Sequence, residues 1–133
     1  MAHTLVNPGG LHDPVPFGYS HTAAIPAGTE LVLVSGQYGS NADGMVVSTD
    51  FAEQVEQAFS NLSVALAAHG LDLSHVAQLR TYVVSPDFDK LGTIGMVVAR
   101  GCGDTPPTQT MIGVAGLAMP DILFEVEAVA ARP

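Results

Sequence analysis

The sequence predicts a single α+β domain, spanning residues 1–133, in which two helices cover one face of a mixed sheet. Several segments have the alternating or continuous apolar pattern of strands, and two longer segments have apolar residues at helical spacing. Their order is strands, helix, strand, helix, strands. The handedness of crossover connections and the width of the apolar helix stripe favour both helices on the same face. The other face is then uncovered in one copy of the chain.

Residues 50–70 contain the strongest helix signal and organise the rest of the fold. Asp50 and Glu53 form a capping-box pattern, and Gly70 can adopt the left-handed conformation that ends a helix. One wide apolar stripe runs along this helix and requires a sheet to cover it. The residues of the stripe are Phe51, Val55, Ala58, Phe59, Leu62, Ala65 and Leu66.

The second helix is expected to start at residues 85–87, where Ser-Pro-Asp is a helix-start signal, and to end at residues 101–104. Phe88, Leu91 and Ile94 have the spacing of a buried helix face. Gly92 and Gly95 each weaken this helix by about 1 kcal/mol relative to alanine.

Strands are expected on both sides of each helix, together with a short edge strand within residues 1–18. They lie at residues 19–25, 31–37, 76–84, 109–114 and 123–130. In the last strand, alternation turns the side chains of Phe124 and Val126 toward the helices and those of Glu125 and Glu127 toward the uncovered face. Two carboxylates are thus expected on a surface that only a neighbouring subunit can cover.

The amino-acid composition limits the kinds of partner that this protein can bind. Its formal charge is −9, with thirteen acidic and only four basic residues, so there is no basic cluster to neutralise the phosphates of a nucleic acid. Charged residues make up 13% of the chain and hydrophobic residues 47%, whereas soluble domains average about 25% charged. We therefore predict an oligomer with an apolar interface and no nucleic-acid partner.

Cysteine and histidine give no sign of a disulfide, metal site or cofactor. Cys102 is the single cysteine, and the histidines lack the spacing of metal ligands. We see neither a signal peptide nor an apolar run long enough to span a membrane. The expectation is a cytoplasmic protein without metal, cofactor or membrane partner.

Each residue that is a candidate for a chemical role could instead have a structural one. Glu125 in an apolar cleft would have a raised pKa suited to proton transfer, or it could form a structural ion pair. Tyr19 could be a packing residue or a pocket wall. Ser35 lies in no nucleophile-elbow pattern and is better suited to hydrogen-bonding a ligand or the backbone.

The order and spacing of several pieces resemble the RidA (YjgF-type) family. The pieces are Asn7-Pro8, Tyr19-Ser20, Ser35-Gly36-Gln37, the helix pattern Gln54-x-x-x-Ala58-x-x-Asn61-Leu62, Pro107-x-Gln109-Thr110, and Glu125-Val126-Glu127-Ala128. The resemblance covers nearly the whole chain. It implies a chorismate-mutase-like fold and a homotrimer with three clefts between subunits.

Active members of that family hydrolyse reactive imines and enamines, such as 2-aminoacrylate, to a ketone and ammonia. The resemblance implies that the tyrosine, the Ser-Gly-Gln strand end and the water-positioning glutamate are retained at Tyr19, Ser35 to Gln37, and Glu125. It also implies three replacements. The carboxylate-binding arginine falls at Gln109, a neighbouring cysteine at Met111, and an asparagine of the second helix at Gly92.

The replacement at Gln109 alters the expected ligand. A neutral hydrogen bond contributes less than a charge-assisted one, so a substrate carboxylate would bind roughly tenfold more weakly. A neutral, amide-bearing or cationic ligand fits better. Arg80 could take the place of the arginine if its face turned into the cleft, or it could pair with Glu127.

The leading hypothesis is a homotrimer whose intersubunit clefts bind a small molecule and hydrolyse an imine or enamine. Two alternatives remain open at this point. The protein could be a non-catalytic ligand-binding or chaperone-like module, or a pathway-specific hydrolase or deaminase of a ring-derived substrate.

Overall fold

A computed structural model describes all residues, 1–133. It contains six strands and two α-helices, with two short 3-10 helices between them. In chain order these are β1 (Thr4–Val6), η1 (Val15–Phe17), β2 (Thr22–Ala24), β3 (Glu30–Tyr38), α1 (Phe51–Ala67), η2 (Leu73–His75), β4 (Val76–Val84), α2 (Phe88–Cys102), β5 (Thr108–Val114) and β6 (Phe124–Arg132).

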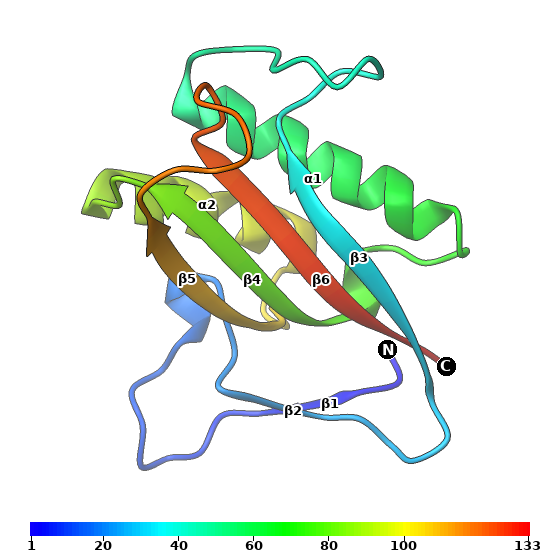
Figure 1. Cartoon of the computed structure of the whole chain (residues 1–133). Coiled ribbons are helices and arrows are strands. Elements are labelled where there is room, and N and C mark those ends of the chain that lie inside the picture. Colours follow the sequence, from blue (N-terminus) through cyan, green and yellow to red (C-terminus); the bar gives the residue numbers. More distant parts are fainter.

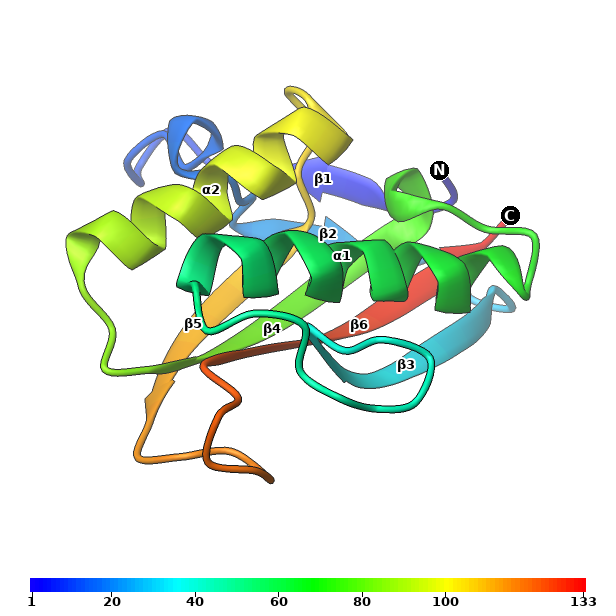
Figure 2. The ribbon, with the colours of Figure 1, turned by 90° about the horizontal axis from the view of Figure 1, so that it is seen from above.

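Four strands form the main sheet in the order β3-β6-β4-β5. Strands β4 and β5 are parallel, while β6 is antiparallel to both of its neighbours. Both helices lie on one face of this sheet, which confirms the predicted fold class (Figures 1 and 2). Strands β1 and β2 form a separate two-stranded sheet.

The predicted strand at residues 19–25 is wrong in extent and in sheet. Only Thr22–Ala24 is a strand, and it pairs with β1 rather than with the main sheet. Ser20 is instead held at the edge of β5, where its backbone N–H and its hydroxyl donate to the carbonyls of Pro107 and Pro106 at 2.9 and 2.6 Å. The local alternation of apolar and polar residues does not predict these long-range hydrogen bonds.

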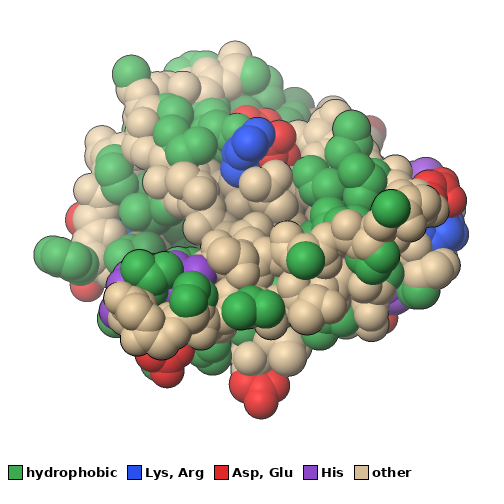
Figure 3. Space-filling view, turned by 90° about the horizontal axis from the view of Figure 1, so that it is seen from below, with side chains coloured by type: hydrophobic (Ala, Val, Ile, Leu, Met, Phe, Trp, Pro, Cys, Tyr) green, Lys and Arg blue, Asp and Glu red, His purple; other side chains and the backbone are tan.

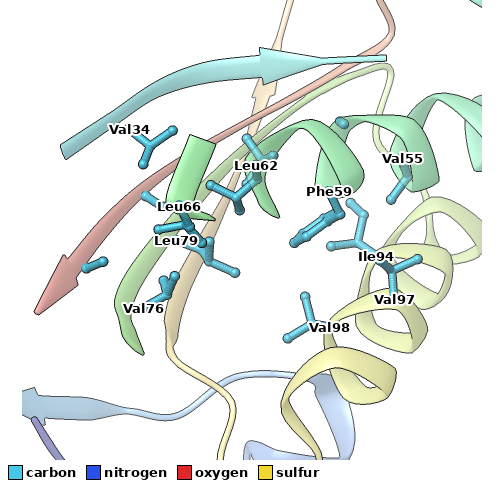
Figure 4. Packing of buried hydrophobic residues seen from close by; sticks show 14 of the residues in the cluster. Val34, Val55, Phe59, Leu62, Leu66, Val76, Leu79, Ile94, Val97 and Val98 are labelled. Atoms are coloured by element: carbon cyan, nitrogen blue, oxygen red, sulfur yellow. The ribbon is translucent and has the colours of Figure 1, made fainter. Parts of the chain in front are cut away.

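The stripe of α1 packs as predicted. Val55, Phe59, Leu62 and Leu66 point into the space between the helices and the sheet (Figure 4), and all are buried. At its start, the Asp50 side chain accepts a hydrogen bond from the Glu53 backbone N–H at 3.0 Å. The reciprocal half of the predicted capping box is not formed, because no bond runs from the Glu53 side chain back to Asp50.

The side-chain amides of Gln54 and Asn61 connect α1 to neighbouring loops by hydrogen bonds. Fully buried Gln54 donates to the carbonyls of Ser48 and Asp121, at 2.8 and 3.0 Å, and accepts from the Leu123 N–H at 2.9 Å. Asn61 donates to the carbonyls of Tyr38 and Ser40, each at 3.0 Å. A buried backbone group without a partner is costly, so these amides specify where the loops lie.

Helix α2 differs from the prediction in its first turn. Ile94 is buried, but the side chain of Phe88 is 91% exposed. The first turn of α2 extends beyond the edge of the sheet (Figure 2), which agrees with the high exposure of Phe88. Helical spacing identified the face of the helix but not the length of sheet available to cover it.

The face of the main sheet turned away from the helices, here called the bare face, carries Arg80, Tyr82, Glu125 and Glu127 together with exposed Leu33. The view from below, on the side where β1 and β2 lie, shows hydrophobic side chains spread over that surface with scattered charged groups between them (Figure 3). None of the helices combines the length and hydropathy needed to span a bilayer.

Candidate functional site

A cavity of about 550 Å³ lies where the N-terminal segment, α2 and β5 meet. Tyr19, Gln109 and Met111, three of the residues predicted for the site, line it together. His12 is a further polar member of the lining, and apolar side chains such as Ile94 supply much of the rest. We call this cavity and its lining the Gln109 half-site.

Gln109 bridges two parts of the fold. Its side-chain nitrogen donates to the Gly18 carbonyl at 3.2 Å, and its side-chain oxygen accepts from the buried Thr81 hydroxyl at 3.3 Å. The amide therefore ties the segment that carries Tyr19 to the sheet. One of its two N–H donors is left for a ligand.

His12 meets Tyr19 in this cavity, with 2.5 Å between its Nε2 and the tyrosine oxygen. The His12 ring also packs edge-on against the rings of Phe17, Tyr19 and His21, with centroid distances of 4.9 to 6.1 Å. Nε2 of His21 donates to the His12 carbonyl at 2.9 Å, which fixes the local backbone. His12 is not among the predicted site residues, because no spacing signal links it to β5.

Glu125 lies on the bare face beside Gly36, the middle residue of the strand end predicted to accompany it. A Cβ atom built at Gly36 would lie 2.7 Å from Cδ of Glu125, so a larger residue there would push that carboxylate out of its present position. The Gln37 side chain donates to the Ser35 carbonyl at 3.1 Å. Gln37 is in register with buried Val126, so its side chain lies on the helix side of the sheet and not with Glu125. We call Glu125 with Gly36 and its neighbour Ser35 the Glu125 half-site.

The electrostatics of the bare face shift the pKa values of Glu125 and Tyr82. Partial burial raises the pKa of Glu125, and the neighbouring Glu127 carboxylate raises it further. The Tyr82 hydroxyl donates to Glu127, and this bond, followed by desolvation, raises the pKa of Tyr82. Arg80 faces Glu127 across the strands but forms no ion pair with it.

Within one chain, the sheet separates the two half-sites. Gln109 is in register with Leu79, whose buried side chain faces the helices, and parallel pairs point to the same side. Glu125 is in register with Tyr82 on the bare face. The two residues therefore lie on opposite faces of the sheet.

Gly92 lies in neither half-site. It is exposed, no atom lies within 4 Å of a Cβ built there, and the α2 residues at the cavity include Gly95, three positions further along. No group of three or more histidine, cysteine or acidic side chains comes together in a way that could hold a metal ion.

Comparisons with known proteins agree with this architecture. The family described as Endoribonuclease L-PSP matches residues 13–132. The RutC family protein YjgH of Escherichia coli K12 is 34% identical over 100% of this chain and 98% of its own length. Protein DfrA of Myxococcus xanthus is 30% identical over 74% of each chain.

A solved structure is also very similar to this fold. YyfB of Yersinia pestis, described as a protein of unknown function of the conserved Rid protein family, superposes with a TM-score of 0.93. It is 34% identical, and the superposition covers 99% of this chain and 100% of YyfB.

Proposed function

Since the chain belongs to the RidA (YjgF-type) family, we propose that it binds a small molecule, and hydrolyses an imine or enamine, in clefts between its copies. The observation that carries the proposal is the placement of Gln109 and Glu125 on opposite faces of one sheet. Two such half-sites can face each other only if they come from different chains. A homotrimer would close three clefts of this kind.

The surface chemistry supports such an assembly. Leu33 on the bare face is 74% exposed and Leu31 on the same strand is 49% exposed. Exposed apolar side chains on a sheet face without a helix are typical of an interface. A second copy covering this face would bring its Gln109 half-site toward Glu125.

In the proposed cleft, Glu125 orients the attacking water. A carboxyl group whose pKa is raised toward neutrality can exchange a proton with water more readily than an ordinary glutamate. The free N–H of Gln109 donates to an oxygen of the substrate. Because no arginine or lysine lines the cavity, we expect a neutral, amide-bearing or cationic substrate rather than a simple 2-imino acid.

The first test generates imines in the assay with an amino-acid oxidase and follows their loss. We expect the protein to accelerate the loss of at least one imine, with those made from asparagine and glutamine, which bear a side-chain amide, ahead of those made from aspartate and glutamate. Glu125→Gln should reduce the rate roughly 100-fold, because it removes the group that exchanges a proton with water. A panel in which no imine, including ring-derived ones, is lost faster than without protein refutes the hydrolase.

The second test asks whether each site is shared between chains. Gln109→Ala and Glu125→Ala should each be inactive alone. After mixing and reassembly, about one quarter of the clefts would pair an intact Gln109 with an intact Glu125 from a neighbour. No recovery of activity in the mixture, with mixed assembly shown by mass spectrometry, contradicts a shared site.

A non-catalytic ligand-binding or chaperone-like module is the second candidate. It is favoured by the hydrogen bonds of Gln109, whose amide is largely engaged by Gly18 and Thr81 rather than free for a ligand. Gln109→Arg separates the two candidates. Activity in the arginine variant but none in the parent supports the module, whereas activity in the parent supports the hydrolase.

Ribonucleic acid is a poor substrate for this chain despite the description of its family. Only four basic residues are present against thirteen acidic ones. Binding of a phosphate backbone requires several lysine or arginine contacts, and the net charge of −9 would repel it.

A further inference from the structure

We infer that Tyr19 and His12 act as an acid pair in the Gln109 half-site, in which the Tyr19 hydroxyl protonates the leaving nitrogen and His12 replaces that proton. This inference rests on the proposed hydrolysis and adds a second proton-transfer group to it. Tyr19 is then the catalytic residue, and His12 acts through it.

The geometry of the pair supports proton transfer. The 2.5 Å between His12 Nε2 and the Tyr19 oxygen is at the short end for any hydrogen bond, and both side chains line the same cavity. Gln109 holds the Gly18 carbonyl, one peptide away from Tyr19. His21 holds the His12 carbonyl, so both partners are fixed through their own backbone.

The other side chains around the cavity do not compete with Tyr19 and His12 as proton donors. Helix α2 and strand β5 contribute only neutral side chains to the cavity, among them Leu91, Ile94, Gln109 and Met111. His21 faces His12 from the same segment, and the Asp13 carboxylate is turned to the Val15 N–H. Histidine is the side chain that commonly gains and loses a proton near neutral pH, so His12 is the natural proton source here.

The proposed reaction is the addition of water to the C=N bond of an imine, followed by cleavage of the C–N bond. The Tyr19 hydroxyl gives its proton to the imine nitrogen while His12, as imidazolium, returns a proton to the tyrosine oxygen. Water adds through oxygen to the electron-poor carbon, the C=N π pair moves to nitrogen, and one water proton passes to Glu125 of the facing chain. Glu125 then passes the proton that it took from water to the amine nitrogen, which allows the C–N bond to break with its electron pair on nitrogen. The hydroxyl proton returns through the Tyr19 oxygen to His12, which restores the imidazolium and leaves a ketone and ammonia.

The test compares His12→Gln, Tyr19→Phe and the double variant, using the imine that the wild-type protein turns over fastest. Each single variant should lower kcat roughly 100-fold, the usual contribution of a positioned acid, with KM changed less than about threefold. The double variant should be no slower than the slower single variant, because the two groups perform one transfer. His69→Gln, at an exposed position beyond α1, is the histidine control and should be unchanged.

The division of the loss between kcat and KM gives the second readout. A His12→Gln variant that only displaced the substrate would raise KM, whereas loss of the proton supply to Tyr19 lowers kcat with KM nearly unchanged. Thermal unfolding of each variant near the wild-type temperature keeps the comparison valid. If the wild-type protein is active and His12→Gln stays within threefold of it, or if the losses of the single variants multiply, the pair is refuted while the hydrolase stands. A wild-type protein without activity overturns both.

Discussion

At the scale of single residues, His3 is the clearest case of a side chain held in an unfavourable ionisation environment. It is only 4% exposed, and its Nδ1 has no hydrogen-bond partner. Burial lowers the pKa of His3 from 6.5, and the nearby amino terminus and His75 lower it further. The folded state therefore favours neutral His3.

This arrangement predicts a loss of stability on mild acidification. Below pH 6.5 the unfolded chain binds a proton at His3 that the folded chain resists, so the free energy of unfolding falls as pH falls toward the lowered folded pKa. Urea denaturation at steps between pH 7.5 and 5 measures the slope. His3→Asn should flatten that part of the curve. The pKa of Asp72 is also lowered, but its contribution is lost only near and below 3.8, outside this window.

If His3→Asn shows the same slope between pH 7.5 and 5 as the wild-type protein, the acid sensitivity comes from elsewhere and the assignment to His3 is wrong.

At the scale of elements, the contact between α2 and η1 shapes the Gln109 half-site. A Cβ built at Gly95 would lie 3.1 Å from the Phe17 carbonyl, and one at Gly18 would lie 2.9 Å from Cα of Gly95. Gly18 also has a φ of +84°, a conformation that favours glycine. Two glycines thus allow the N-terminal segment to approach the helix closely enough to line the cavity.

Gly92 and Gly95, two of the three glycines within α2, form a matched pair for testing this contact. Gly92→Ala should stabilise the protein by about 1 kcal/mol, because alanine favours the helix and no atom lies within 4 Å of the new Cβ. Gly95→Ala gains the same helix propensity but pushes against the Phe17 carbonyl, so its net stability should be clearly lower than that of Gly92→Ala. Urea denaturation measures both, and equal stabilisation by the two alanines would contradict the close contact.

At the scale of the whole molecule, the apolar composition and the exposed apolar side chains of the bare face both favour the proposed assembly of several copies. A chain with 47% hydrophobic and 13% charged residues leaves apolar side chains at its surface, and Leu33 is among the most exposed of them. Val64 on the outer side of α1 is similarly exposed, at 69% against 74% for Leu33. The two residues differ mainly in the face of the molecule on which they lie.

This difference predicts opposite effects on assembly. Leu33→Glu places a charge in the proposed interface and should convert the assembly to monomers, whereas Val64→Glu should leave its mass unchanged. Sedimentation velocity at micromolar concentration distinguishes the species. A wild-type protein that is itself monomeric would contradict the proposed clefts, and dissociation by Val64→Glu alone would place the interface on the helical side.

Local sequence pattern predicted the structure correctly where the conformation of an element depends on its own residues. The stripe of α1, its Asp50 cap and the bounds of β4 follow from periodicity and capping chemistry, because each depends on residues within a few turns. Periodicity failed for β2 and for Phe88, where long-range hydrogen bonds and the extent of the sheet decide the outcome.

For the site, the sequence by itself determined which side chains are available: a glutamate on the bare face, a tyrosine in the N-terminal segment, and a neutral glutamine at position 109. Only the tertiary structure decided how they are grouped. It placed Gln109 and Glu125 on opposite faces and brought His12 against Tyr19, because strand register sets the side of the sheet and loop packing joins segments distant along the chain.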